Sequence, residues 1–222
     1  MDFTARLLRA LGHEWAISDI EEYLGTGNPS AFTTPFAGRR FEEIDGGGDR
    51  TDVANAFTAA DVAAIGTLSV ALAPQAIDEL LFGAVGRDAA RALARIPTDI
   101  DIYDPQAQVL HDYAGTELWE ALFRLKDVGR TKASKLIARK RPHLFPVIDS
   151  VVVRALGDPA NFWQPTLKAY STSAVRDRVG ELRRGARVPS TISDLRVSDI
   201  AVWMRFRKGG SQGRPSDAGQ HT

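Results

Sequence analysis

Apolar residues recur every three or four positions along most of the chain, which is the spacing of one face of an α-helix. This pattern predicts two short amphipathic helices in residues 1–24 and further helices within 58–72, 76–93, 109–125, 131–139, 150–156, 175–182 and 192–206. Residues 31–50 lack the period and are rich in aromatic residues and glycine, so we expect a short strand or extended arm around Arg39 to Ile44. A flexible loop at Gly46-Gly47-Gly48 should follow. The chain is therefore predicted to be mostly α-helical, with a short extended N-terminal segment.

The same pattern divides the chain into three parts. Residues 1–50 hold the N-terminal helices and the glycine-rich arm, and residues 51–206 form a helical core with a hairpin at 118–140. Residues 207–222 are polar and rich in glycine and serine, which predicts a disordered tail. No apolar run is long enough to span a membrane, and the N-terminus lacks the apolar core of a signal peptide. We therefore expect a cytoplasmic protein with no membrane partner.

The hairpin at 118–140 combines a glycine turn with a basic helix. An apolar stripe leads into Val128-Gly129, and Gly129 can adopt the positive φ of a sharp reversal between two helices. The second helix carries Lys132, Lys135 and further basic residues beside its apolar face. A helix N-terminus opened by glycine suits a phosphate group, and basic side chains beside it add affinity for a nucleic-acid backbone. The alternative is a surface hairpin with a solvated lysine face.

A loop bracketed by two prolines follows the basic helix. Pro142 and Pro146 end that helix, and Phe145 is one of several loop residues apolar enough to be buried. Asp149 then stands at the front of the next helix, where an aspartate acts as an N-cap by default. It is also a carboxylate that follows a buried loop and lies beside the candidate phosphate-binding turn.

The order and spacing of these pieces resemble the helix-hairpin-helix DNA glycosylases, in particular the endonuclease III and adenine glycosylase group. That superfamily has the pattern L-x-G-V-G-x-x-T-A, an apolar loop, and then V-D-[ST]-x-[VI]-x-R. The matching residues here are Leu125, Val128, Gly129, Ala133, Asp149, Ser150, Val152 and Arg154, with Ile148 in place of the valine. The interval from the turn glycine to the aspartate, 149 − 129 = 20, is the one expected of endonuclease III-like members.

A second resemblance covers nearly the whole chain. The strings G-R-R-F-E, G-G-G-D and S-x-L-R-V-x-D-x-x-x-W-M resemble a bacterial family of similar length that was long without an assigned function. This resemblance implies no activity by itself.

The glycosylase resemblance implies a two-lobed helical fold, with the middle helices in one lobe and the N-terminal segment and C-terminal helices in the other. Double-stranded DNA would enter between the lobes of a monomer, and Asp149 would stabilise the charge on the sugar of a flipped-out nucleotide. The DNA-binding residues that it implies are Val128, Gly129, Arg130, Thr131, Lys132, Lys135 and Arg154. No cofactor is implied, although members of this superfamily can hold a monovalent cation on the hairpin carbonyls.

Two positions depart from the superfamily pattern. Asp127 replaces the first glycine of the turn, and Thr131 stands where members that also cleave the strand hold a Schiff-base lysine. Lys132 is one place away, which on a helix is a rotation of roughly 100°. We therefore expect a monofunctional glycosylase that leaves an abasic site.

The sequence does not identify the base that would be excised. Tyr113, Trp119 and Phe123 precede the hairpin and are candidates for stacking on the base, although core packing explains each of them as well. Two settings stay open: repair of damaged bases, and phage defence by excision of modified bases such as glucosylated hydroxymethylcytosine. A noncatalytic helix-hairpin-helix DNA-binding protein is the competing class.

Composition narrows these possibilities only in part. The 28 basic and 28 acidic residues cancel, so only local clusters of charge support binding to nucleic acid. The absence of cysteine excludes the cysteine-held iron–sulfur cluster that several glycosylases carry. The four histidines are scattered without metal-ligand spacing, so no metal is expected.

Overall fold

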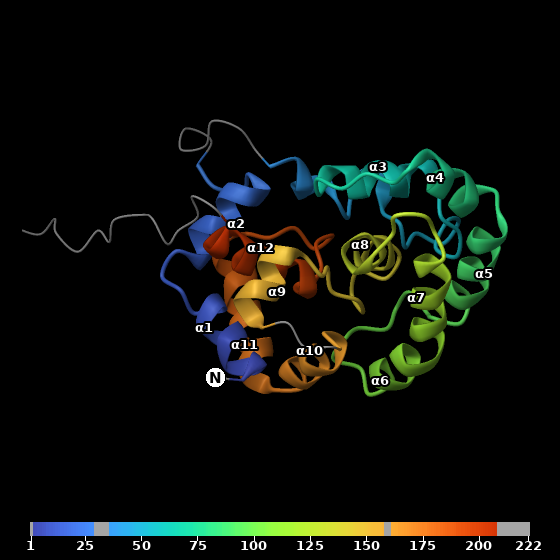
Figure 1. The fold of residues 1–222 in the computed structure, drawn as a ribbon. Coiled ribbons are helices and arrows are strands. Elements are labelled where there is room, and N and C mark those ends of the chain that lie inside the picture. The colour runs from blue at the N-terminus through green and yellow to red at the C-terminus, as the bar shows by residue number, and fades with distance from the viewer. Residues whose placement is uncertain (1, 29–35, 158–160, 208–222) are drawn as a thin grey trace, which may run out of the picture.

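The structure, a computed structural model, describes residues 2–28, 36–157 and 161–207, and the predicted disordered tail lies outside these ranges except for Arg207. Within the described ranges the chain forms twelve α-helices and no β-strand (Figure 1). The helices are α1 (Phe3–Leu11), α2 (Ala16–Leu24), α3 (Ala59–Thr67), α4 (Pro74–Leu81), α5 (Ala84–Leu93), α6 (Ala107–Leu110), α7 (Thr116–Phe123), α8 (Arg130–Lys140), α9 (Ser150–Leu156), α10 (Trp163–Tyr170), α11 (Ser173–Gly185) and α12 (Asp194–Phe206). The prediction of a mostly α-helical protein is confirmed.

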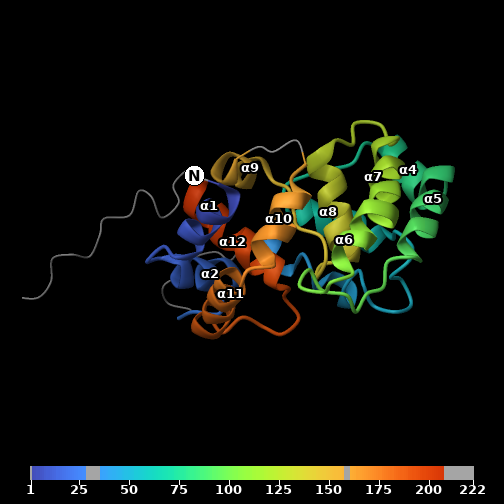
Figure 2. The ribbon, with the colours of Figure 1, turned by 90° about the horizontal axis from the view of Figure 1, so that it is seen from below.

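Two separate hydrophobic clusters hold these helices together. One cluster joins α1 and α2 to α9–α12, so the two ends of the chain share a core. The other is built from α3–α8 with the segment before α3, the loop after α8 and Trp163 of α10. Figures 1 and 2 show the two groups of helices side by side, with α8 surrounded by α3 and α7 in the second group. A boundary at residue 50 therefore does not separate the two cores, because α9–α12 pack on α1 and α2.

Local signals explain where several helices begin. Thr58 and Asp61 form a reciprocal capping box at the start of α3. Pro74 occupies the first turn of α4, where its missing N–H costs nothing. None of the described helices has both the length and the apolar character that crossing a membrane would require.

The segment before α3 is not the expected strand. Residues 37–40 and 44–46 form short 3₁₀-helices, η2 (Ala37–Arg40) and η3 (Ile44–Gly46). Gly48 is buried, and a Cβ there would lie 2.4 Å from the carbonyl oxygen of Arg139. The glycines therefore permit a close approach to α8 rather than a free loop.

The end of α8 is not the solvated basic face that its charges suggested. Arg139, Lys140 and Arg141 are all at most 2 % exposed. Arg139 Nη1 donates to the carbonyl of Phe41 at 2.8 Å, and Lys140 Nζ donates to the carbonyl of Val53 at 3.0 Å. Buried cations need such partners, so these charges serve the fold and are not available to DNA.

Candidate active site

The turn between α7 and α8 is sharp, but its geometry differs from the prediction at Gly129. Gly129 is the N-cap of α8 with φ −102° and ψ −171°, which is an extended conformation open to other residues. The left-handed position is Asp127, with φ 58°. Aspartate tolerates this region better than most residues, so Asp127 makes the reversal that we had assigned to glycine.

The residues of this turn differ in exposure. Val128 is 6 % exposed and anchors the turn in the core, whereas Gly129 is exposed. Arg130, Thr131 and Lys132 in the first turn of α8 are partly exposed. No side chain caps α8, so its N-terminus presents backbone N–H groups and three polar side chains together.

The loop between α8 and α9 is buried and tied to α8, as predicted. Phe145 is 1 % exposed and Ile148 is 4 % exposed. The Ser134 hydroxyl on α8 accepts the backbone N–H of Ile148 at 3.0 Å. This contact fixes the position of the next residue, Asp149.

Asp149 caps α9 and also reaches a buried lysine. Its Oδ1 accepts the N–H of Val151 at 2.8 Å, which confirms the predicted cap. Its Oδ2 lies 3.5 Å from Lys135 Nζ, and the carboxylate side chain is 20 % exposed. One carboxyl group thus has a fixed orientation and access to solvent.

Lys135 does not lie on the surface where we predicted a phosphate contact. Its side chain is 3 % exposed, and its Nζ donates to the carbonyl of Leu68 at 2.8 Å. Burial lowers the pKa of Lys135, while the nearby Asp149 and Asp199 carboxylates act in the opposite direction. Lys135 is therefore a buried partner of Asp149, and the prediction that it grips DNA is corrected.

Asp149 and Lys135 line a pocket of about 200 Å³ at the junction of the two hydrophobic clusters. Its aromatic wall comes from Tyr23 on α2, Phe36, and Trp203 on α12. The rings of Tyr23 and Phe36 stack with centroids 5.0 Å apart. Trp203 meets both rings edge-on, at 6.0 Å from Tyr23 and 5.7 Å from Phe36. The pocket thus combines an aromatic wall with a carboxylate that is partly exposed to solvent.

A second carboxylate in this pocket comes from α12. Asp199 is 8 % exposed and is paired with Arg196, which also donates to the Tyr23 hydroxyl at 2.5 Å. Burial raises the pKa of Asp199 to about 6, against the attraction of Arg196. Gly38 allows this packing, because a Cβ there would lie 2.1 Å from the Tyr23 hydroxyl oxygen. Within the described ranges, no group of three or more His, Asp or Glu side chains could hold a metal ion.

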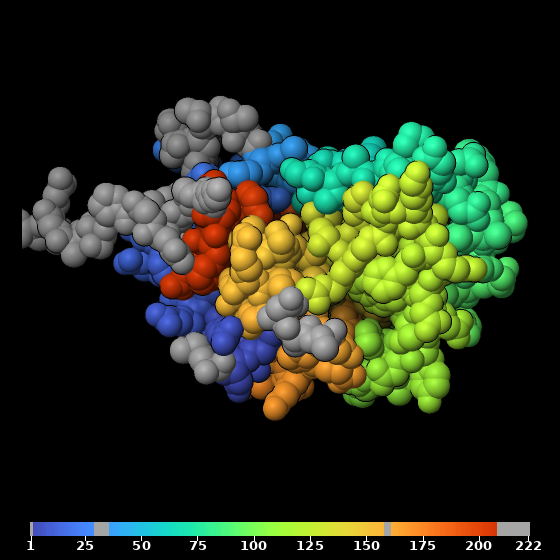
Figure 3. Space-filling model, viewed as in Figure 1, coloured from blue at the N-terminus to red at the C-terminus, as the bar shows by residue number. Residues whose placement is uncertain are grey.

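The aromatic residues predicted to stack on a base lie elsewhere. Trp119 and Phe123 line a different pocket of about 340 Å³, with His111 stacked on Trp163 at 4.5 Å. Figure 3 shows a hollow where the yellow-green segment meets α10 in orange. Asp149 does not line this pocket, and Tyr113 is 70 % exposed and lines neither. The structure therefore does not bring these three residues to the predicted carboxylate.

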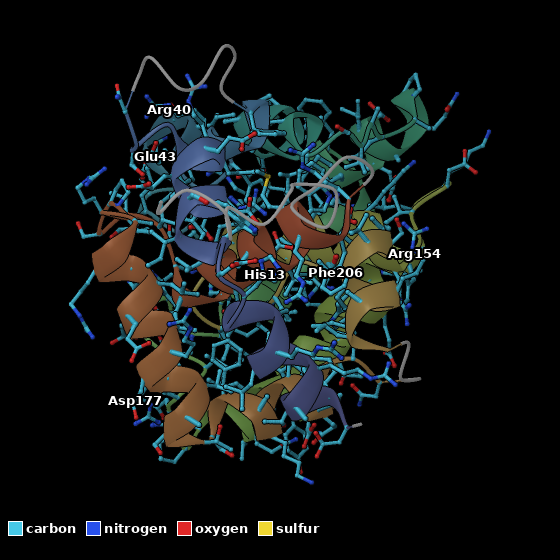
Figure 4. All side chains as sticks on the ribbon, turned by 90° about the vertical axis from the view of Figure 1, so that its left-hand side faces the viewer. His13, Arg40, Glu43, Arg154, Asp177 and Phe206 are labelled. Atoms are coloured by element: carbon cyan, nitrogen blue, oxygen red, sulfur yellow. The ribbon has the colours of Figure 1, made fainter. Side chains whose placement is uncertain are left out.

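Arg154 is exposed on α9, as a DNA contact requires. In Figure 4 it lies at the periphery of the molecule. It is five residues beyond Asp149, on the helix that Asp149 caps.

Most residues of this pocket were not among the site residues predicted from the sequence. The charged and aromatic ones among them are Tyr23, Phe36, Arg196, Asp199 and Trp203. The spacing of the last three on α12 (i, i+3, i+7) is the signal that could have found them, because it sets two charges and an aromatic ring on one face of an apolar helix. The strings G-R-R-F-E and S-x-L-R-V-x-D also meet here, since Glu42 accepts the N–H and hydroxyl of Ser193 at 2.8 and 2.7 Å.

Comparison with known proteins gives one result that bears on identity. No curated protein and no solved structure matches the chain significantly. The sequence profile of a family of unknown function matches residues 16–206, which include every pocket residue named above and all buried residues of the two hydrophobic clusters except Leu7, Ala10 and Leu11 of α1. The chain therefore belongs to this family, DUF6308.

Proposed function

We propose that the protein is a monofunctional DNA glycosylase that uses Asp149 to hydrolyse the N-glycosidic bond of a flipped-out nucleotide. The observation that carries the proposal is the Asp149 carboxylate at the rim of an aromatic pocket, oriented by Val151 and Lys135. An enzyme that acts on a base in a duplex must extrude the base into such a pocket. Aromatic side chains stack on a base of any kind, which suits the wall formed by Tyr23, Phe36 and Trp203.

The chemistry at Asp149 follows from its charge and access. The C1′–N bond breaks with its electron pair on the base, which then takes a proton, and positive charge develops at C1′ and the ring oxygen. A carboxylate beside that carbon stabilises the charge and can accept the proton of the attacking water. The products are a free base and an abasic sugar. Lys135 acts as a positioning residue, because it holds the carboxylate oxygen that does not cap α9.

The turn before α8 would hold the DNA backbone. Its uncapped helix start, with Arg130, Thr131 and Lys132 partly exposed, suits a phosphate group. Exposed Arg154 adds a second cation on the α9 side. Val128 anchors the turn and Gly129 leaves the approach clear, since a Cβ at Gly129 would meet nothing within 4 Å. We expect this hairpin to act as the helix-hairpin-helix of the superfamily that the sequence resembles.

The absence of strand cleavage is part of the proposal. Thr131 has no amine, and the amine nearest to Asp149 in the pocket lining is that of Lys135, which is buried and donates to the carbonyl of Leu68. Borohydride treatment during turnover is therefore expected to trap no covalent protein–DNA adduct. A trapped adduct would assign lyase chemistry to the protein and overturn the monofunctional assignment.

Abasic-site formation tests the proposal directly. Purified protein is incubated with oligonucleotides that carry oxidised, deaminated or alkylated bases and with modified phage DNA, and abasic sites are detected by alkali cleavage. Asp149→Asn should keep DNA binding and lose excision, whereas the surface control Asp177→Asn should keep both. Normal turnover by Asp149→Asn would refute the role of this residue.

The substrate panel also separates the two biological settings. Release of a base only from modified phage DNA, for example glucosylated hydroxymethylcytosine, would support phage defence. Release from damaged oligonucleotides would support repair. DNA binding without abasic sites on any substrate would favour the alternative, a noncatalytic DNA-binding protein, which gives no reason for a carboxylate in an aromatic pocket.

A further inference from the structure

In the Asp149 pocket the main hydrogen-bond donors have partners within the protein, whereas one acceptor has none among the described residues. Lys135 Nζ donates to the carbonyl of Leu68 and faces Asp149. The Arg196 guanidinium pairs with Asp199 and donates to the Tyr23 hydroxyl and to the carbonyl of Gly38, at 3.2 Å. A ligand that offers only acceptor atoms would therefore have to share these donor groups with the acceptors of the protein.

One acceptor atom of a pocket-lining residue lacks a partner in the part of the chain that the structure describes. Asp199 Oδ2 is paired with Arg196, but its Oδ1 is buried and accepts no hydrogen bond from any residue that the structure describes. Asp199 is 8 % exposed, so more than nine-tenths of the residue is removed from solvent. A buried acceptor without a donor is unfavourable, and a ligand that reaches it with an N–H group would recover that loss.

The shape of the pocket limits what can bring that donor. Stacked Tyr23 and Phe36 and the edge-on Trp203 favour a flat ring. Ile200 and Leu68 add apolar surface to the lining. The fitting ligand is a planar heterocycle with N–H groups on one edge.

We infer that this pocket selects nucleobases that carry an exocyclic amino group, and that Asp199 is the residue that reads it. The identification of the ligand as a nucleobase rests on the proposed function. Cytosine, adenine and guanine present an amino group on their pairing edge, whereas thymine and uracil flank their single N–H with two carbonyl oxygens. A carboxylate accepts from the amino group and repels the carbonyl oxygens. A site built to pair a buried polar group discriminates strongly against a ligand that leaves that group unpaired.

Binding to a single unpaired nucleotide tests this selection without turnover. Five fluorescent duplexes carry cytosine, adenine, guanine, thymine or uracil opposite an abasic analogue. Each target nucleotide has a 2′-fluoro group, which withdraws electrons and blocks cleavage of the N-glycosidic bond. Fluorescence anisotropy with the native chain at pH 7.5 should give dissociation constants about tenfold or more lower for the three amino bases. Equal binding of all five duplexes, or binding too weak to detect, overturns the inference.

The role of Asp199 is tested with a matched pair of variants. Asp199→Asn replaces the carboxylate by an amide that both donates and accepts, so thymine and uracil should gain affinity until the preference falls below threefold. Asp177→Asn makes the same chemical change on the surface of α11 and should leave the ranking unchanged (Figure 4). A ranking that survives Asp199→Asn would assign the selection to another group. If Asp199→Asn does not fold, the ranking by the native chain still decides whether amino bases are selected.

The test separates this inference from the proposed function. Abasic sites formed without any ranking of the five bases would leave the glycosylase proposal standing and remove the inference. A ranking that depends on Asp199, without abasic sites on any substrate, would do the reverse.

Discussion

Replacing Asp61 with asparagine is expected to destabilise the protein strongly, because this carboxylate lies between two buried cations. Asp61 is 1 % exposed, with its Oδ2 2.5 Å from Lys140 Nζ and its Oδ1 3.1 Å from Arg139 Nε. It also closes the capping box of α3 through the N–H of Thr58 at 2.9 Å. The change leaves the cap nearly isosteric and removes the negative charge.

The expected magnitude follows from the burial of all three groups. Removing one member of a buried ion pair costs about 3–5 kcal/mol, because the remaining charge is left uncompensated. The carbonyls that accept from Arg139 and Lys140 offset part of this cost, so we expect the lower end, about 3 kcal/mol. For a domain of this size that corresponds to a fall in Tm of about 6–12 °C.

Urea unfolding followed by circular dichroism measures this loss. Asp177→Asn on the exposed face of α11 is the control, and its free energy of unfolding should change by less than about 0.5 kcal/mol. A loss below about 1 kcal/mol for Asp61→Asn would mean that backbone carbonyls alone stabilise the two cations, and the reasoning about α8 would fail.

Three further changes test the turn and the pocket. Asp127→Gly should raise the free energy of unfolding by about 1 kcal/mol, because it relieves the left-handed strain at φ 58°, and an unchanged urea midpoint would contradict this. Gly38→Ala should lower the free energy of unfolding by about 1–3 kcal/mol, because its Cβ would displace the Tyr23 hydroxyl. Gly129→Ala should lower it by less than about 1 kcal/mol, because nothing lies within 4 Å of the added Cβ. Equal destabilisation of the two variants in thermal unfolding would refute this contrast. Burial raises the pKa of Asp199 to about 6, so this side chain is mainly a carboxylate above about pH 7 and mainly protonated below about pH 5. The preference for amino bases, measured by anisotropy, should therefore be lost on acidification. A ranking of the five bases that stays constant from pH 7 to pH 5 would contradict this. The charged and titratable groups that act on Asp199 are Arg196, Tyr23, Lys135, Asp149 and Tyr170.

Local signals in the sequence predicted much of the fold. Helical periodicity located most of the helices, and the cap at Asp149 is where the residue type indicated. These features depend on neighbours within a few positions, which the sequence displays directly. The buried loop before Asp149 was also predictable, because Phe145 and Ile148 are apolar.

Long-range partners could not be predicted in the same way. A lysine on a helix is expected to be exposed to solvent. Nothing near Lys135 in the sequence indicates that its Nζ contacts the carbonyl of Leu68 and the carboxylate of Asp149. The aromatic wall combines Tyr23 with Trp203, residues that are 180 positions apart. The expected strand at 39–44 failed for a related reason, since this segment supplies carbonyls to cations of α8 and curls into 3₁₀ turns to do so.

Arg139 and Lys140 at the end of α8 also make the N-terminal segment indispensable to the centre of the molecule. Their acceptors include carbonyl oxygens of Phe41, Ile44 and Gly48. A shortened chain that starts at residue 51 would keep the guanidinium and ammonium groups but lose these oxygens, and buried cations without acceptors favour unfolding. The helical region 51–206 is therefore not a separable unit, and any dissection of the protein into smaller pieces has to retain the residues around Phe41.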